Sequence, residues 1–260
     1  MASSASEQLC YIDFAAGNVS LYKQQKKQYD DLVGWLVKNG SNYGLEPELE
    51  RLDDVGRESL ASIYEGPGAT QITLSDPRSF TPPPSLLLPR LHLSINTTSA
   101  LKKTSDNFLT LLTNEKGLIS KKVPGRPLKY QGSVVHRIEQ RFIAQGGDLT
   151  RGDGSGGESI YGGTFNDDKE GLKTGFHYGT IAMANSGKNS NSSQFFLTLT
   201  SEPARLKKLT GKYVAFGRSL VQGEGPTARE SRACLEALDA LGDGKGGTTE
   251  SVWIDNCGLL

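Results

Sequence analysis

Short runs in which apolar and polar residues alternate recur along the chain, as they do in half-buried β-strands. Residues 91–95 show the pattern most clearly, because leucine and isoleucine fall on one side and His92 and Ser94 on the other. Further strands are predicted at residues 10–14, 195–200, 213–217 and 251–256. Many short strands separated by turn residues indicate a barrel or a sandwich.

Two segments of this strand-rich pattern have helical periodicity instead. Residues 99–113 place Leu101, Phe108 and two further leucines on one side of a helix. Residues 231–241 place three leucines three residues apart, again on one side. Two core helices among many strands predict a mainly β fold.

A long segment between the first two predicted strands, residues 19–85, departs from the alternating pattern. Apolar residues from Tyr22 to Leu36 fall at helical spacing, and Asn39-Gly40 predicts the end of that helix. The segment is therefore expected to be partly helical.

The same segment carries a second set of helix signals further on. A helix is predicted to begin near Pro47, since proline suits a first helical turn, and to end at the Gly-Pro-Gly of residues 66–68. The triple proline at 82–84 predicts an extended spacer. We predict one domain over residues 1–260, with residues 19–85 as a helical and proline-rich insertion. Such an insertion either covers part of the barrel surface or serves a partner or a targeting function.

Composition limits what the protein is expected to bind. The 260 residues carry 29 basic and 29 acidic side chains, so the formal net charge is zero. No global field would then attract nucleic acid or an anionic membrane. No apolar run approaches the length of a membrane span, and residues 1–8 lack the basic and apolar regions of a secretion signal. We expect a monomer of the cytoplasm or nucleus.

Residue types that carry metal, redox or nucleophilic chemistry are sparse and scattered. Cys10, Cys234 and Cys257 fit neither a disulfide framework nor a zinc signature, so reduced thiols are expected. The histidines have no paired spacing, and the serine-hydrolase pattern GxSxG is absent. The glycine-rich run 152–157 lacks the lysine of a phosphate loop. We expect neither a metal nor a cofactor.

The stretch of residues 130–148, YQGSVVHRIEQRFIAQGGD, sets Arg137 among apolar residues. Arginine is rarely buried without a partner. An arginine between strand-like runs therefore predicts a lined groove, although a surface arginine between two strands is the alternative. His136 beside it is a candidate base, but we favour a structural imidazole packed beneath the groove.

A second stretch supplies amide and aromatic groups that suit the lining of such a groove. Residues 181–187 lead through a polar loop to residues 193–196. Asn185 and Gln194 offer paired amide donors and acceptors, and Phe196 offers an aromatic wall.

Four motifs in this order resemble one known family. HRIEQRFIAQGGD at 136–148, RGDGSGGESIYG at 151–162, MANSGKNSNSSQFF at 183–196 and GKYVAFG at 211–217 resemble the cyclophilins, which are peptidyl-prolyl cis-trans isomerases inhibited by cyclosporin. The similarity covers about residue 91 to the C-terminus and one N-terminal strand. It implies a closed eight-stranded antiparallel β-barrel capped by two helices, with the helical insertion between the first two strands.

The resemblance also implies an activity and a set of site residues. The activity is rotation about X-Pro peptide bonds in proline-containing peptides or proteins, assisting folding or conformational switching, with Arg137 as donor to the proline nitrogen. The residues implied as catalytic are Arg137, Phe142, Gln145, Asn185 and Phe196. Those implied as substrate-binding are Ile143, Gly154, Ala184, Ser186, Gln194, Leu209 and Tyr213.

The chain departs from the family's usual pattern at the rim of the implied groove. Glu139 stands at a usually aliphatic position, Ser186 replaces a common alanine, and Tyr213 stands where histidine is frequent. Lys208 falls where a groove tryptophan is typical. We therefore expect activity with reduced cyclosporin affinity.

Two other functions stay open at this point. A proline-binding scaffold without useful turnover is the main alternative, since the rim is altered. The basic loop at 116–129 would suit an RNA-associated factor, but no aromatic RNA-binding motif accompanies it.

Overall fold

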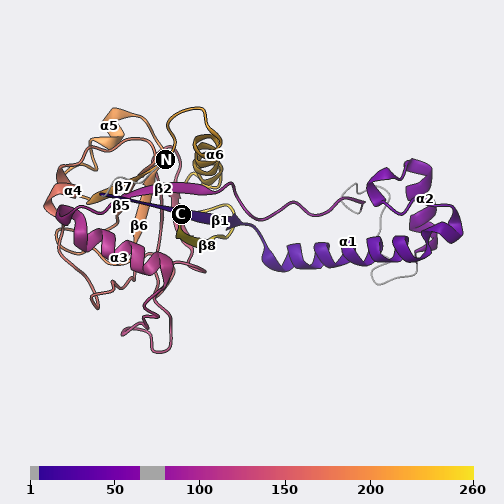
Figure 1. Ribbon diagram of the computed structural model, residues 1–260, viewed down its shortest axis with the longest axis horizontal. Helices are drawn as coiled ribbons and strands as arrows, with labels where there is room; N and C mark the ends of the chain where they lie inside the picture. Colours follow the sequence, from indigo (N-terminus) through magenta and orange to yellow (C-terminus); the bar gives the residue numbers. More distant parts are fainter. Residues whose placement is uncertain (1–5, 65–79) are drawn as a thin grey trace. The chain divides into compact units, whose positions relative to one another are not determined.

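The structure is a computed structural model that describes residues 6–64 and 80–260 (Figure 1). The chain divides into two compact units, one made of residues 1–16 and 87–260 and the other of residues 17–86. We call them the barrel unit and the helical unit.

The described part of the barrel unit forms one eight-stranded antiparallel sheet in the order β3-β4-β6-β5-β7-β2-β1-β8. The strands are β1 (Glu7–Ala16), β2 (Leu91–Asn96), β3 (Val135–Glu139), β4 (Ile143–Gly146), β5 (Thr180–Met183), β6 (Phe195–Thr198), β7 (Ala215–Ser219) and β8 (Val252–Leu259). The edges approach where Val134 bridges to Trp253 and Ile254 donates its N–H to the carbonyl of Ser133 at 2.9 Å. The sheet is thus a nearly closed barrel, and the predicted mainly β fold is confirmed.

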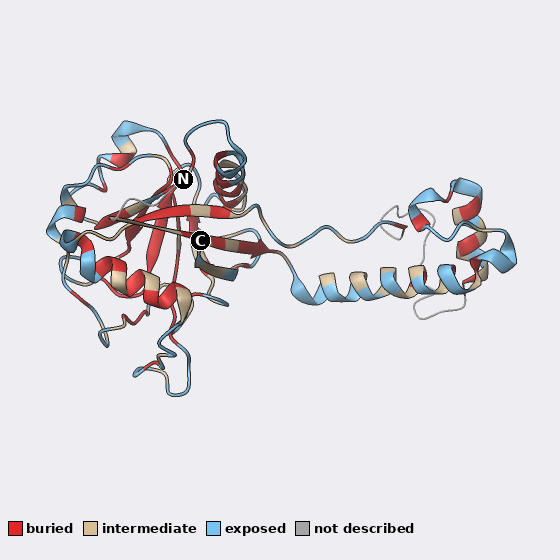
Figure 2. Ribbon diagram, viewed as in Figure 1, coloured by how far each residue is buried: buried red, intermediate tan, exposed pale blue. Residues whose placement is uncertain are grey.

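Two helices complete the barrel core, as the sequence pattern predicted. Figure 1 shows α3 (Lys102–Thr113) and α6 (Pro226–Ala240) on opposite sides of the strands. Figure 2 shows buried residues gathering on the strands and on one side of each helix. Phe108 of α3 has its ring 5.6 Å from that of Phe195 and 5.1 Å from that of Phe216. The strand and helix signals therefore converge on one aromatic-rich core.

Two helices of the barrel unit differ from the expected pattern. Helix α6 begins five residues before 231, because Pro226 occupies its first turn, where a missing N–H costs nothing. Residues 165–178 contain the short helix α4 (Lys169–Lys173), where no helix was predicted. Gly171 lets α4 approach β7, since a Cβ there would lie 2.9 Å from the carbonyl oxygen of Ala215.

The helical unit has a small core of its own. Its elements are α1 (Val19–Asn39), the 3-10 turns η1 (Gly40–Tyr43) and η2 (Leu49–Arg51), and α2 (Asp54–Ile63). The first predicted helix and its end at Asn39 are confirmed. The buried apolar residues of this unit are Leu32, Leu36, Leu49, Leu52, Leu60, Tyr64 and Phe80.

The predicted start of the second helix near Pro47 is wrong. Asp53 is the N-cap of α2 and its carboxylate accepts the N–H of Gly56 at 2.8 Å. A capping carboxylate satisfies a free helix N–H, whereas Pro47 precedes only a 3-10 turn. The predicted end at residues 66–68 lies outside the described residues. Residues 82–85, which hold the triple proline, have no regular secondary structure.

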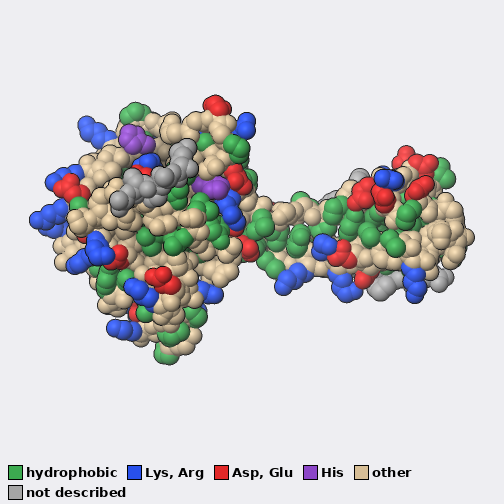
Figure 3. Space-filling model, viewed as in Figure 1, with side chains coloured by type: hydrophobic (Ala, Val, Ile, Leu, Met, Phe, Trp, Pro, Cys, Tyr) green, Lys and Arg blue, Asp and Glu red, His purple; other side chains and the backbone are tan. Residues whose placement is uncertain are grey.

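The surface agrees with the balanced composition. Basic and acidic side chains are interspersed over the face shown in Figure 3. None of the helices in the described ranges combines the length and the apolar character needed to cross a bilayer.

Candidate functional site

Strand register gathers the site on the outer face of the barrel. Arg137 of β3 lies opposite Gln145 of β4, which lies opposite Phe196 of β6, which lies opposite Ala182 of β5. Residues directly opposite each other in antiparallel strands project from the same face. Four strands therefore contribute one row of side chains, while the next residues along, such as Phe195, turn into the core.

A second apolar cluster lies under this row, separate from the barrel core. It consists of Ile143, Phe176, Ala182, Ala184, Phe196, Leu206, Leu209 and Ala215, with Phe142 and Tyr213 packed against it. The ring of Phe196 is stacked on Phe176 at 6.1 Å and meets Tyr213 edge-on at 5.2 Å. Phe176 was not among the predicted site residues, because no motif in its local sequence marks it as part of a groove.

A groove of about 380 Å³ opens above this cluster. Its walls include every residue implied as catalytic, namely Arg137, Phe142, Gln145, Asn185 and Phe196. Ile143, Ala184, Leu209 and Tyr213 also line it, together with Lys208 and with Lys212, which was not predicted. An apolar floor with a few converging polar groups is the usual form of a ligand site.

Arg137 is paired but not enclosed. Its Nη2 donates to Oε2 of Glu139 at 2.8 Å, and the two side chains are 46% and 42% exposed. Its sequence neighbours Val135 and Ile138 do not surround it, because both lie in the barrel core. Alternation along the strand turns Ile138 inward, and the register irregularity between Val135 and Arg137 turns Val135 inward as well.

Gln145 is held by a chain of amides behind the groove. Its Nε2 donates to Oε1 of Gln194 at 2.8 Å, and Gln194 donates to the carbonyls of Gly154 at 2.9 Å and Gly156 at 2.8 Å. Gln194 and Gly154 were predicted to bind substrate but are not among the residues that line the groove. In this arrangement they orient Gln145.

Asn185 lines the same groove as Gln145. Its Nδ2 donates to the carbonyl of Lys212 at 3.1 Å, and its Oδ1 accepts the N–H of Gly187 at 3.2 Å. Ser186, also predicted to bind substrate, is exposed and bonds to Ser190 instead of lining the groove.

Comparison with known proteins agrees with this geometry. The family model described as cyclophilin type peptidyl-prolyl cis-trans isomerase/CLD matches residues 90–258. The chain belongs to the cyclophilin family. The match takes in the whole groove but leaves the helical unit outside it.

In this cyclophilin, Asp148 anchors the glycine-rich loop beside the groove. It is 3% exposed and accepts the backbone N–H groups of Thr150, Arg151, Gly154 and Gly156. Burial alone would raise the pKa of Asp148, but these four donors outweigh it and hold the pKa below its usual value. The carboxylate is thus the fixed point around which residues 148–156 are arranged.

His136 lies behind the same loop, away from the groove lining. A Cβ on Gly154 would lie 2.7 Å from its ring, so only glycine fits against this imidazole. Burial lowers the pKa of His136, and neither ring nitrogen has a hydrogen-bond partner among the described residues. The neutral imidazole packs and does not reach a substrate in the groove. No group of three or more metal-ligating side chains occurs in the described parts of the chain.

Proposed function

We propose that this cyclophilin catalyses cis-trans isomerisation of X-Pro peptide bonds and so assists the folding or conformational switching of proline-containing proteins. One observation carries the proposal. Arg137 stands in strand register with an oriented amide, Gln145, and an aromatic wall, Phe196, over an apolar floor.

The chemistry of this reaction suits such a site. The barrier of about 18–20 kcal/mol comes from amide resonance, and no covalent bond is formed or broken. At the twisted transition state the proline nitrogen regains a basic lone pair, which accepts a hydrogen bond. A donor that bonds this lone pair stabilises the twisted state over either planar isomer. The guanidinium of Arg137 is that donor in our proposal.

The other groove residues would hold the substrate. Phe142, Phe196 and Leu209 give the proline ring an apolar seat, while Gln145 and Asn185 bond the flanking peptide groups. Lowering the barrier by about 7 kcal/mol would accelerate rotation roughly 10⁵-fold. In our proposal, fixed donors and this apolar seat supply the acceleration without a nucleophile or a base.

The ion pair between Arg137 and Glu139 does not block this role. Both side chains are more than a third exposed, and exposed pairs contribute only about 0–1 kcal/mol. Substrate can therefore displace Glu139 from Arg137 at small cost.

A protease-coupled assay on a proline peptide tests the proposal. We expect Arg137→Ala to lower kcat/KM at least 100-fold while the fold is retained, because the side chain is half exposed. Arg218→Ala is the matched control, since Arg218 is an exposed barrel arginine paired with Glu7 at 3.0 Å. Near-wild-type turnover by folded Arg137→Ala would remove the assignment.

A proline-binding scaffold is the second candidate. Two features of the groove rim favour a scaffold: Arg137 is bonded to Glu139, and a lysine stands at position 208. Peptide binding without any acceleration of isomerisation would support this function and exclude the first.

The altered rim also leads us to propose weak cyclosporin binding. Lys208 lines the groove but offers no aromatic face. Loss of one neutral hydrogen bond costs about 0.5–1.5 kcal/mol, and loss of an aromatic contact costs about 2 kcal/mol more. We expect affinity at least tens-fold below that typical of the family. Nanomolar inhibition in the same assay would contradict this.

A further inference from the structure

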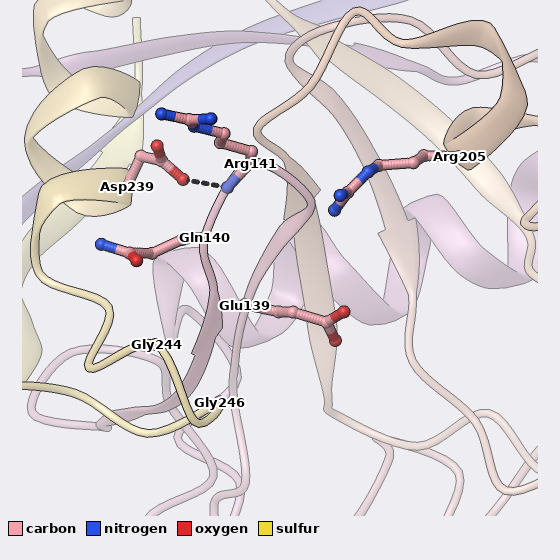
Figure 4. Close-up of a pocket in the computed structure, with 7 residues that line it drawn as sticks. All are labelled: Glu139, Gln140, Arg141, Arg205, Asp239, Gly244 and Gly246. Carbon is pink, nitrogen blue, oxygen red and sulfur yellow. Dashed lines mark hydrogen bonds between the residues drawn. The ribbon is translucent and has the colours of Figure 1, made fainter.

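A second, polar pocket of about 480 Å³ lies next to the groove (Figure 4). It is lined by Glu139, Gln140, Arg141, Arg205, Asp239, Gly244 and Gly246. The residues come from the end of β3, the turn after it, helix α5 (Pro203–Leu206), and the end of α6 with the loop that follows. We call it the side pocket.

The walls of the side pocket continue into those of the groove. Glu139 in the side pocket is bonded to Arg137 in the groove. Arg141 of the side pocket directly precedes Phe142 of the groove. A chain leaving the groove past Arg137 therefore enters the side pocket.

Local contacts build the side pocket as a fixed structure. Arg141 has the left-handed φ of 56°, and its backbone N–H donates to Asp239 of α6, as Figure 4 shows. Gly242 packs tightly on β3, since a Cβ there would lie 3.2 Å from the carbonyl oxygen of Ile138. These contacts tie the turn after β3 to the segment after α6.

The charged groups at the entrance already have partners. Nε of Arg205 bonds Glu202 at 2.7 Å, and Glu139 bonds Arg137. Neither Nη of Arg205 has a partner among the described residues, and Figure 4 shows Arg205 and Glu139 pointing into the same space. The lining carries two basic and two acidic side chains, so a charged ligand would gain little net attraction.

A peptide main chain matches this arrangement. Each peptide unit offers one N–H and one carbonyl, which fit the carboxylate of Glu139 and the terminal N–H groups of Arg205. On the opposite wall, a Cβ at Gly244 or Gly246 would meet nothing within 4 Å, so a backbone can approach there closely.

We propose that the side pocket is an extension subsite that binds the main chain of one substrate flank, beyond the residues held by the groove. This rests on the proposed isomerase function, because it assigns a longer substrate to the same enzyme. It also makes Glu139 a specificity-determining residue, which meets the substrate flank on one side and Arg137 on the other.

Kinetics on three peptides with the full chain test the subsite. The first is a short blocked proline peptide, and the others add three alanines to its amino or its carboxyl side. We expect one extension to lower KM at least about tenfold, since two hydrogen bonds to charged groups are gained. Arg205→Ala and Glu139→Ala should reduce that ratio to about two or below, and using the ratio cancels any effect of Glu139 on Arg137.

Arg229→Ala is the control, because Arg229 is exposed on α6 and is not among the residues that line either pocket. It should keep the full ratio. Equal KM values for all three peptides, or a ratio that survives in both pocket variants, would overturn the subsite.

Binding measurements separate this inference from the proposed function. If no peptide is isomerised, amide chemical shifts of Gly244 and Gly246 are followed during titration with each peptide. Shifts caused by an extended peptide but not by the short one support the subsite without turnover. Unchanged shifts at both glycines with every peptide would refute it.

Discussion

The barrel unit and the helical unit of this chain are stabilised in different ways. The barrel unit buries ionised groups within its loops, as Asp148 and Glu158 are 3% and 1% exposed. The helical unit keeps its ion pairs at the surface, at helical spacing, as in Lys26–Asp30 and Lys27–Asp31 of α1. Its interior is a small apolar cluster.

This difference indicates that the functional site lies in the barrel unit. Buried charges are costly unless fully hydrogen-bonded, and those of the barrel unit fix the irregular loops beside the groove. Surface pairs at i,i+4 add only about 0.3–0.5 kcal/mol each. The barrel unit therefore uses buried, hydrogen-bonded charges to shape the loops of its site, whereas the helical unit is stabilised by periodic apolar packing.

Replacing Asp148 should give the largest effect on stability. Asp148→Ala leaves four backbone N–H groups without their acceptor, one in a buried bond and three in partly buried bonds. Hydrogen bonds to charged groups are worth about 1.5–3 kcal/mol each, and water replaces part of this where the N–H is partly exposed. We expect the barrel unit to lose about 4 kcal/mol, with faster amide exchange at residues 148–156 and unchanged exchange in α1. Asp153→Ala, which removes an exposed carboxylate of the same loop, should cost under about 1 kcal/mol. Similar losses in both variants would contradict the anchoring role.

Replacing Leu36 should destabilise the helical unit, again measured by amide exchange. The side chain is 0% exposed, and replacing a buried leucine by alanine leaves a cavity and costs about 2–5 kcal/mol of stability. Leu36→Ala should speed amide exchange in α1 and α2 but leave peptide isomerisation unchanged. Val37→Ala is the neighbouring control, because Val37 is 62% exposed and surface changes cost within about 0.5 kcal/mol. Loss of isomerase activity in folded Leu36→Ala would show that the two units are coupled.

Acid should weaken the barrel unit in two steps. The folded pKa of His136 is lowered by burial, so its contribution is full above the unfolded value of about 6.5 and is lost as pH falls through the folded pKa. For Asp148, burial opposes ionisation, but the backbone donors lower the folded pKa. Its contribution is full above about pH 3.9 and is lost below that.

Denaturant unfolding of the barrel unit between pH 7 and pH 3 measures this. Asp148→Asn should abolish the step below about pH 4 and leave the step below about pH 6.5. A wild-type barrel unit equally stable from pH 7 to pH 3 would exclude both contributions.

Removing the helical unit should have the smallest effect on catalysis. Ala15 bridges to Leu87, and Leu88 donates its N–H to the carbonyl of Phe14 at 2.8 Å. The two ends of the segment are therefore already joined within the barrel unit, so a short turn can replace residues 18–85. We expect kcat/KM on a small peptide to stay within about twofold of the wild-type value. Loss of turnover by a folded variant would mean that the helical unit contributes to the groove.

Part of the fold follows from local sequence. Alternation at 91–95 and helical spacing at 99–113 predicted β2 and α3, because periods of 2 and 3.6 residues record which side faces the core. The motifs around Arg137 and Asn185 named the family and most of the groove lining. Where signals compete within a few residues, as at Pro47 and Asp53, sequence alone selected the wrong helix start.

The arrangement of the site was decided only by the tertiary structure. Register between strands far apart in sequence sets Arg137 beside Gln145 and Phe196, and it places Gln194 behind them. The side pocket joins Glu139 and Arg205 across 66 positions of the chain. Periodicity reports the facing of each residue within its own element, but not which distant residue lies opposite. That pairing is fixed by the packing of the whole barrel, because a shift of one residue would turn every side chain of a strand to the other face.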